Sequence, residues 1–256
     1  KNNISGTTEN IHLLKMELNG VEPNTDVNIA LDNNSLHYVT RSSNDSIFLL
    51  HENNQWVIAA KPDSYEKGPQ RYGTFKEAFN HKMIFVYGTS GNREENEWNF
   101  NKAKYDAETW YYRGNGSVDI IPDKEYSIEK YPGRNVIIYG NTNSNSAWKI
   151  LLNDCPITVT RSGIKAGIEN FTGDDLGTYF VWPMKNSPAN SVGVIAGTGL
   201  NGMNAANPNQ YFAGASGFPD FMIFRLGMLH SGADKVEMAG FFDNDWRLAR
   251  GESIKK

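Results

Sequence analysis

Three segments of the sequence place a glycine and a Thr or Asn directly after a short apolar run, a pattern that suits both helix capping and ligand binding. They are Gly88-Thr89-Ser90, Gly140-Asn141 with Asn143 close behind, and Gly197-Thr198-Gly199. Glycine permits a tight backbone turn, and Thr, Ser or Asn can cap the free N–H groups of a following helix. The same N–H groups, with the positive end of the helix dipole, can bind a polar ligand. The pattern predicts capping and, at the same positions, a candidate ligand crevice.

One of these loops also resembles a dinucleotide-binding loop. Residues 197–202 match G-x-G-x-x-G directly after an apolar run. In that motif a helix begins directly at the glycine loop, and an acidic residue stands at the end of the next strand. Here residues 204–208 separate the glycines from the predicted helix. Asp220 stands at the start of the next apolar run, whereas the motif has its acidic residue at the end of that run. Nucleotide-cofactor binding is kept as an alternative, and no cofactor is predicted.

A serine hydrolase would carry a G-x-S-x-G elbow, in which the serine stands on a strained turn after a strand. Residues 88–92 have Asn in place of the last glycine, and residues 214–218 have Phe there. His230 is the one histidine late enough to serve as a triad base, but a surface histidine that ends a helix is the favoured explanation. No catalytic residue is predicted, and whether the chain is an enzyme is left open.

A second way to build an enzyme would use the strand-end loops themselves. Asn141, Asn143 or Thr198 would stabilise an anion there, and the carboxylate of Asp245 would act as base. Such a hydrolase or transferase is the main alternative function.

Metal chemistry has little support in the sequence. No H-x-x-x-H, C-x-x-C or EF-hand spacing occurs. The tight acidic groups are Asp174-Asp175 and Asp243-Asn244-Asp245, which turns and capping explain, with a divalent-ion site as the alternative. Cys155 is the single cysteine, which excludes an internal disulfide and indicates a small packed residue. No metal is predicted.

The composition excludes two classes of partner. The chain has 25 Lys and Arg against 29 Asp and Glu, a net charge of -4 and no basic run, so a nucleic-acid partner is not expected. Its longest apolar stretches, such as residues 83–87, have the length of a strand and not the ~20 residues of a membrane-spanning helix. No membrane partner is expected.

The elements that position these residues divide into two parts. Residues 10–60 contain short apolar runs separated by turn-forming groups such as residues 32–35 and 52–55, where Asn and Asp tolerate left-handed φ. Residues 61–72 lose this periodicity and form a linker. We therefore predict a small β-rich layer with its linker at residues 1–70 and a second domain at residues 71–256.

In the second domain, apolar runs of strand length alternate with helical patterns. Strands are predicted at 83–87, 118–121, 135–139, 192–196, 221–224 and 236–242, and helices at 96–113, 146–152 and 209–215, with an inserted β-hairpin from 157–160 and 179–182. This alternation predicts an α/β fold, a Rossmann-like doubly wound and mostly parallel sheet. Ligands of such sheets bind at the carboxyl ends of the strands. Gly88, Thr89, Gly140, Asn141, Gly197 and Thr198 should then cluster at one sheet edge.

Several segments of this domain form a set that is specific as a group. They are Phe75–Phe79, Val86–Thr89, Glu95–Trp98, Lys102–Glu108, Tyr112–Gly116, Arg134–Asn141, Gly173–Leu176, Ala196–Gly199 and Ala239–Phe242. The set resembles the accessory region of large bacterial proteins of the α/β-hydrolase esterase or prolyl-oligopeptidase-like type. In those proteins a separate hydrolase domain on the same polypeptide carries the catalytic triad.

The resemblance implies that this chain is a non-catalytic accessory or docking domain of a secreted or periplasmic serine esterase or peptidase. Its expected partner is the hydrolase domain of the same polypeptide. A small polar or carbohydrate ligand at the strand-end edge is a further expectation. Hydrolysis by the strand-end loops and nucleotide-cofactor binding are the alternatives.

Overall fold

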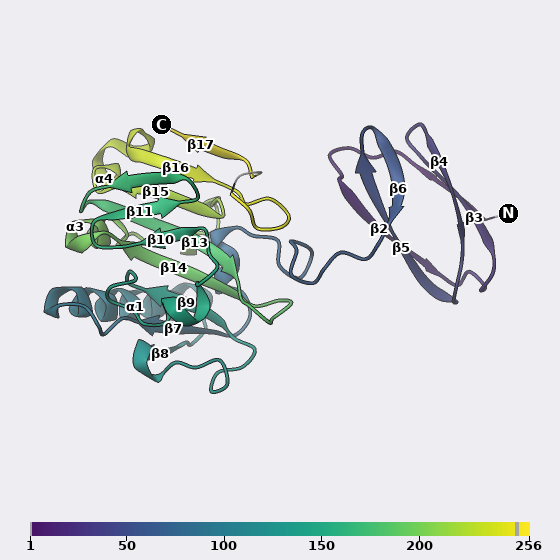
Figure 1. The fold of residues 1–256 in the computed structure, drawn as a ribbon. Helices are drawn as coiled ribbons and strands as arrows, with labels where there is room; N and C mark the ends of the chain where they lie inside the picture. Colours follow the sequence, from purple (N-terminus) through teal and green to yellow (C-terminus); the bar gives the residue numbers. More distant parts are fainter. Residues whose placement is uncertain (1, 249–250) are drawn as a thin grey trace. The chain divides into compact units, whose positions relative to one another are not determined.

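The computed structural model describes residues 2–248 and 251–256, and the chain divides into two compact units, residues 1–63 and 64–256 (Figure 1). The division falls after Asp63, whereas the sequence places the boundary between residues 70 and 71. Each unit has its own hydrophobic core.

The first unit consists of two three-stranded sheets. One has the order β1-β3-β4, with β1 parallel to β3, and the other is the antiparallel sheet β2-β5-β6. Asp32, Asn53 and Asn54 adopt the left-handed φ expected of the two turns. The strands are β1 (Asn2–Gly6), β2 (Leu13–Asn19), β3 (Asp26–Leu31), β4 (Asn34–Val39), β5 (Asn44–Glu52) and β6 (Gln55–Ala59).

The core of the first unit lies between its two sheets. Alternate residues of β3 are buried, as expected when one face of a strand packs inward. Ile29 of β3 and Leu49 of β5 are fully buried in one cluster, so both sheets contribute to it. Trp56 in β6 joins that cluster, and its indole N–H donates to Asp32 at 2.9 Å.

The second unit is built on an eight-stranded mixed sheet of order β17-β16-β15-β13-β14-β9-β7-β8, which Figure 1 draws from top to bottom. From β8 to β14 neighbouring strands are parallel, and from β14 to β17 they are antiparallel. The strands are β7 (Met83–Tyr87), β8 (Asp119–Pro122), β9 (Asn135–Tyr139), β13 (Leu176–Pro183), β14 (Ser191–Gly197), β15 (Phe221–Arg225), β16 (Val236–Gly240) and β17 (Ser253–Lys255).

Both faces of this sheet are covered. Successive residues of a strand point to opposite faces, and Tyr179 of β13 stacks on Phe75 and contacts Tyr211, on the face that α1 and α3 cover. Phe180 contacts Trp148 of α2 on the other face. The helices are α1 (Arg93–Gly114), α2 (Trp148–Leu151), α3 (Gly199–Ala205) and α4 (Met228–Ser231), with 3-10 turns η1 (Phe75–Phe79), η2 (Asp123–Glu125), η3 (Gln210–Phe212) and η4 (Gly232–Lys235).

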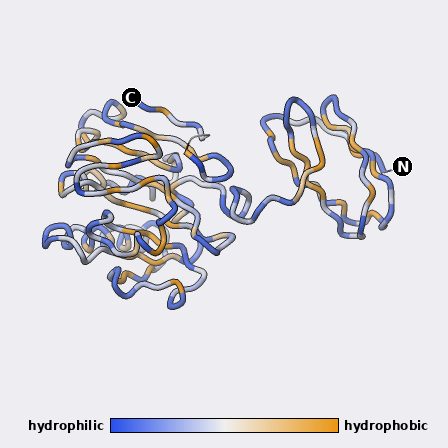
Figure 2. The backbone as a smooth tube through the Cα atoms, in the orientation of Figure 1, coloured by the Kyte–Doolittle hydropathy of each residue, from blue (hydrophilic) through white to orange (hydrophobic). Residues whose placement is uncertain are grey.

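A small antiparallel sheet adds to the same core. It has the order β10-β11-β12, formed by Ile157–Val159, Gly163–Ala166 and Glu169–Thr172. Its buried residues, among them Ile164 and Phe171, belong to the core cluster of the large sheet. Figure 2 shows the apolar residues gathered along the strands and the hydrophilic ones in the connecting loops.

The predicted α/β fold with a Rossmann-like, doubly wound and mostly parallel sheet is wrong, because the described structure is mostly β and its largest sheet is mixed. Segment 179–182, predicted to form an inserted hairpin with 157–160, belongs to β13 in the middle of the large sheet, where it pairs antiparallel with β14 and β15. Residues 157–159 pair instead with β11. Antiparallel neighbours need only short connections, whereas parallel ones need a crossover such as a helix. The five strands β13 to β17 therefore follow one another along the chain without a long helix between them.

Two predicted helices also shrink to single turns. Residues 146–152 form only α2, Trp148–Leu151, and residues 209–215 form only η3, Gln210–Phe212. Pro208 before the second segment and Gly214 and Gly217 near its end disfavour a longer helix. The predicted strands at 83–87, 118–121, 135–139, 192–196 and 221–224 and the long helix at 96–113 are confirmed, with small shifts at their ends.

Candidate functional site

The three glycine-containing loops lie side by side at one edge of the large sheet. β7, β9 and β14 are adjacent and parallel, so the residues that follow them share that edge. The N–H of Gly88 donates to the carbonyl of Tyr139, and the N–H of Gly140 donates to that of Ile195, each at 3.0 Å. The structure brings together Gly88, Thr89, Gly140, Asn141, Gly197 and Thr198, and we call their surroundings the strand-end edge.

Glycine is required at two of these positions for different reasons. Gly140 has a φ of +106°, which residues with a Cβ rarely adopt. At Gly88 the constraint is space, because a Cβ there would lie 2.3 Å from the carbonyl oxygen of Ser144. The loop after β9 therefore packs directly against the end of β7.

Side-chain hydrogen bonds join these loops to one another. Asp123, in the turn after β8, accepts from the N–H and the hydroxyl of Thr89 at 3.0 and 2.7 Å and from the N–H of Ser146 at 2.6 Å. The amide of Asn141 donates to the carbonyl of Gly197 at 2.9 Å. Asp123 and Asn141 are buried. The polar side-chain atoms that the sequence suggests for ligand binding therefore form hydrogen bonds between the loops.

Three further candidates lie at the rim of the same edge. Ser90 and Asn143 are exposed, and Gly199 opens α3 and is half-buried. The side-chain oxygen of Asn143 accepts from the backbone N–H of Arg161 at 3.1 Å. These exposed groups are what the strand-end edge presents to solvent.

Asp245 lies elsewhere. It is exposed and precedes Trp246, whose ring lies 6.3 Å from that of Trp182. Trp182 pairs with Val192 near the start of β14, whereas Thr198 follows the end of that strand. The structure therefore places Asp245 at the opposite edge of the sheet and does not bring its carboxylate to the loops.

The two serine–glycine segments differ in their surroundings. Ser90 is exposed, as described, and its N–H donates to the carbonyl of Ser144. The hydroxyl of Ser216 lies 2.6 Å from the carbonyl oxygen of Gln210. His230 is exposed in the short helix α4, which agrees with the interpretation of a surface histidine.

The acidic groups act in turns and ion pairs. Asp243 accepts from the N–H groups of Asp245 and Arg247 at 3.0 and 2.7 Å, the predicted turn role. Asp175 pairs with Arg225 at 2.7 Å. Within residues 2–248 and 251–256, no group of three or more His, Cys, Asp or Glu side chains is placed to hold a metal ion.

One ion pair links the strand-end edge to the small sheet. Arg161 donates to both carboxylate oxygens of Glu95 at 2.7 Å each, and Glu95 also accepts from the N–H of Asn92 at 2.8 Å. Asn92 accepts in return from the N–H of Glu95, which completes a capping box at the start of α1. Arg161 is the main cause that lowers the pKa of Glu95, against the effect of burial.

A buried polar cluster, missed from the sequence, fastens α1 to the sheet. Lys102 Nζ lies 2.7 Å from Asp106 Oδ1 and 2.7 Å from the hydroxyl oxygen of Tyr211. The hydroxyls of Tyr211 and Tyr139 donate to Asp106 Oδ2 at 2.5 and 3.0 Å. All four side chains are buried, and we call them the Lys102 cluster.

Burial and pairing have opposite effects on the charges in the Lys102 cluster. Burial lowers the pKa of Lys102 and raises that of Asp106, and the charge and hydrogen bond of each partner oppose these shifts. Burial also raises the pKa values of Tyr139 and Tyr211. Removing one partner of a buried pair leaves an uncompensated charge, so the pair depends on α1 being in its place.

The spacing in α1 contained a signal for this cluster. The buried residues of the helix recur every three or four positions, at Glu95, Trp98, Lys102 and Asp106. Lys102 and Asp106 thus belong to the same face as Trp98. A charged pair four residues apart on a buried helix face indicates a polar cluster in the core, and apolar residues alone do not reveal it.

Above this cluster lies an open groove of about 650 Å³, which we call the α1 groove. α1, which packs against α3, forms one side, and the segments after α3 and β15 form the others. Figure 1 shows these helices on one side of the unit. The groove is lined by Trp98, Asn101, Lys102, Tyr105, Asn204, Asn207, Pro208, Leu226 and Leu229.

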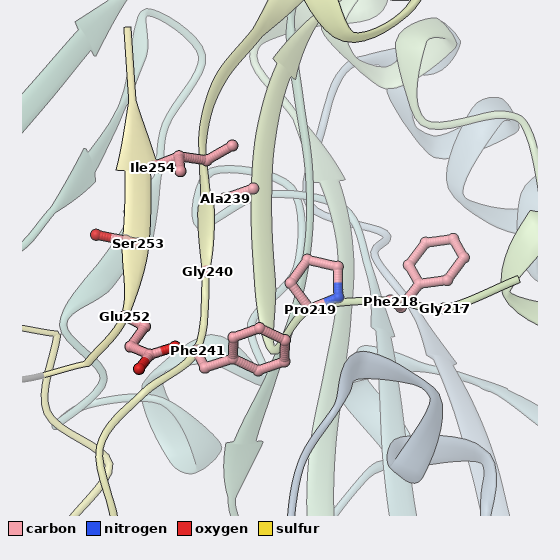
Figure 3. A pocket seen from close by; sticks show the side chains of 9 residues that line it. All are labelled: Gly217, Phe218, Pro219, Ala239, Gly240, Phe241, Glu252, Ser253 and Ile254. Atoms are coloured by element: carbon pink, nitrogen blue, oxygen red, sulfur yellow. The ribbon is translucent and has the colours of Figure 1, made fainter.

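A second depression, of about 560 Å³, lies where β16 and β17 run side by side, next to the segment 217–219 that leads into β15 (Figure 3). We call it the β16 hollow. Phe218, Pro219, Phe241 and Ile254 supply apolar side chains, and Glu252 stands at its margin. Phe241 is 45% exposed and Ile254 72% exposed.

No protein-family model and no curated protein matches the chain. The resemblance to hydrolase accessory regions therefore stays a prediction that rests on its own residues. In the described part of the chain, none of the helices has the length and apolar character to cross a membrane.

Replacing Lys102 by Met should lower the free energy of unfolding by about 3–5 kcal/mol, because Asp106 would keep a buried charge without its partner. Urea denaturation measures this loss. Lys104→Met is the matched control, since Lys104 is exposed and lies 3.6 Å from Glu108 on the same helix. It should cost less than about 1 kcal/mol. Equal losses in the two variants would contradict the role given to the Lys102 cluster.

Glu95→Gln should lower the melting temperature at neutral pH, because the amide cannot pair with Arg161 as a charge. The folded pKa of Glu95 lies below its unfolded value of about 4.3. The stabilisation is therefore complete above that pH and is lost as the pH falls through the folded pKa. Thermal unfolding from about pH 7 to pH 3 should show the difference from wild type shrinking.

The control for this variant is Glu97→Gln, which removes an exposed pair with Arg93. Exposed pairs contribute little, so its melting temperature should stay close to that of the wild type. A difference between Glu95→Gln and wild type that stays constant with pH would show that the carboxylate charge is not what stabilises α1.

Proposed function

We propose that this chain is a non-catalytic accessory domain that docks, through the β16 hollow, against a serine-hydrolase domain of the same polypeptide. The observation that carries the proposal is that two large apolar side chains, Phe241 and Ile254, line the hollow and are exposed to solvent. The resemblance of residues 75–242 to accessory regions of exported bacterial hydrolases supports the partner and a secreted or periplasmic location.

The chemistry of the hollow suits a protein partner. Burying a large apolar side chain contributes roughly 1.5–3 kcal/mol, so Phe241 and Ile254 together supply a central anchor. In Figure 3 their side chains lie with Pro219 around one depression, and the carboxylate of Glu252 lies next to Phe241 at its margin, whereas Ser253 points away. An apolar centre with a polar rim is the usual anatomy of a protein interface.

The strand-end edge has a supporting role in this proposal. The side chains of Asp123 and Asn141 are engaged with neighbouring loops, which makes the edge a rigid frame. The residues of this edge do not line the hollow, so their contribution is to the stability of the sheet on which the hollow lies.

Docking is tested with the hydrolase domain that the proposal expects in the parent gene product, and a parent gene product without such a domain would itself overturn the proposal. Titration calorimetry of the two purified proteins should give a measurable Kd, and Phe241→Asp should weaken it by about tenfold or more, as loss of an interface anchor does. Phe100→Asp is the matched control, because Phe100 is 43% exposed on α1, outside the hollow. Absence of binding, or equal effects of the two variants, would overturn the proposal.

The chain alone should not turn over activated acetyl or butyryl esters. A colorimetric esterase assay at enzyme concentrations that detect slow turnover is the measurement. Turnover that Ser90→Ala or Ser216→Ala abolishes would show that the chain is an enzyme in its own right and would refute the accessory role.

A further inference from the structure

The α1 groove has apolar walls of the kind that contact sugar rings. Tyr105 is 50% exposed and Leu229 is 44% exposed, and both line the groove with Leu226 and Trp98. A pyranose ring presents C–H groups on its faces and hydroxyls at its edge. The exposed ring of Tyr105 offers a flat apolar surface to such a face, with a polar hydroxyl at its end.

Amide side chains stand beside these walls. Asn101, Asn204 and Asn207 all line the groove. Asn207 accepts from Trp98 and donates to Asn204 Oδ1 at 3.3 Å, and each of the three amides has further donor and acceptor capacity. Sugar hydroxyls likewise donate and accept, so amides match them without supplying a charge. A mostly apolar concave site with a few placed polar groups is the general form of a small-molecule site.

The charge of the groove indicates the class of ligand. Among the described residues that line it, Lys102 alone is charged, and its ammonium is 2.7 Å from the carboxylate of Asp106. The side chain of Lys102 is 1% exposed. The ammonium is therefore committed to its partner, and the groove favours a neutral ligand over an anion.

The wall opposite α1 is held in place before any ligand binds. The indole N–H of Trp98 donates to Asn207 at 2.8 Å, and the amide of Asn209 donates to the hydroxyl of Thr109 at 2.9 Å. The hydroxyl of Tyr179 donates to the carbonyl of Pro208 at 2.9 Å. Segment 207–209 is thus fastened to α1 and to the sheet, which lowers the ordering cost of binding.

From these features we infer that the α1 groove is a binding site for a neutral saccharide, with Tyr105 as its stacking platform and Asn101, Asn204 and Asn207 as its hydroxyl partners. The groove and the β16 hollow are lined by different residues. Sugar binding therefore does not depend on docking at the hollow, and either can fail while the other holds.

The test is affinity electrophoresis of the 256-residue chain in native gels that contain neutral arabinoxylan, mixed-linkage β-glucan, galactomannan or soluble starch. At least one of these should retard the protein. Tyr105→Ala should weaken that retardation by about tenfold, as loss of a central aromatic contact does. Tyr112→Ala is the matched control, because Tyr112 is 88% exposed on the same helix and lies outside the groove.

A second measurement places the ligand. Oligosaccharides of the retarding polymer should shift the NMR signals of the side-chain amides of Asn101 and Asn207 and of the indole N–H of Trp98. No retardation by any of the four polymers would overturn the inference. Equal loss in Tyr105→Ala and Tyr112→Ala, or shifts confined to residues outside the groove, would do so as well.

Discussion

The hydrogen bonds that join the loops after β7, β9 and β14 are the constraint on which the second unit depends. The carbonyls at the ends of buried strands lose water, and leaving one unpaired costs about 1–3 kcal/mol. Asn145 provides hydrogen bonds to such carbonyls at the ends of two strands. Its side-chain amide donates to the carbonyls of Val86 and Tyr139 at 3.0 and 2.9 Å. With these carbonyls satisfied, the loops also set where α1 and α3 begin.

Helix α1 connects this frame to the surface. Its first turn is fixed by the capping box and Arg161, and its middle by the Lys102 cluster. The α1 residues that line the α1 groove lie close to the capping box and to the Lys102 cluster. A surface that projects from a helix held at two places keeps its shape, which is why the same buried polar groups that stabilise the core also define the groove.

The sequence was sufficient for the elements whose signal is local. The strand 83–87, the long helix and the shared edge of the glycine loops follow from periodicity and from the geometry of parallel strands. The position of β13 does not follow in this way. All eight of its residues are buried, and the predicted segment 179–182 is wholly apolar, so it fits a hairpin or a central strand equally well. β13 pairs with β14 across the short connection 184–190, but its other partner, β15, lies beyond α3 and η3. The distance of Asp245 from the loops likewise depends on contacts far along the chain.

The two borders of the large sheet are short. β17 has three residues and β8 has four, and Lys255 and Asp119 carry charges there, paired with Glu169 and Arg134. Pro122 ends β8 without an N–H to offer. Long, flat and apolar borders are templates for aggregation, so this sheet resists growth by strand addition from another copy. Association at the β16 hollow must then come through side chains, which keeps contact with a partner separate from aggregation.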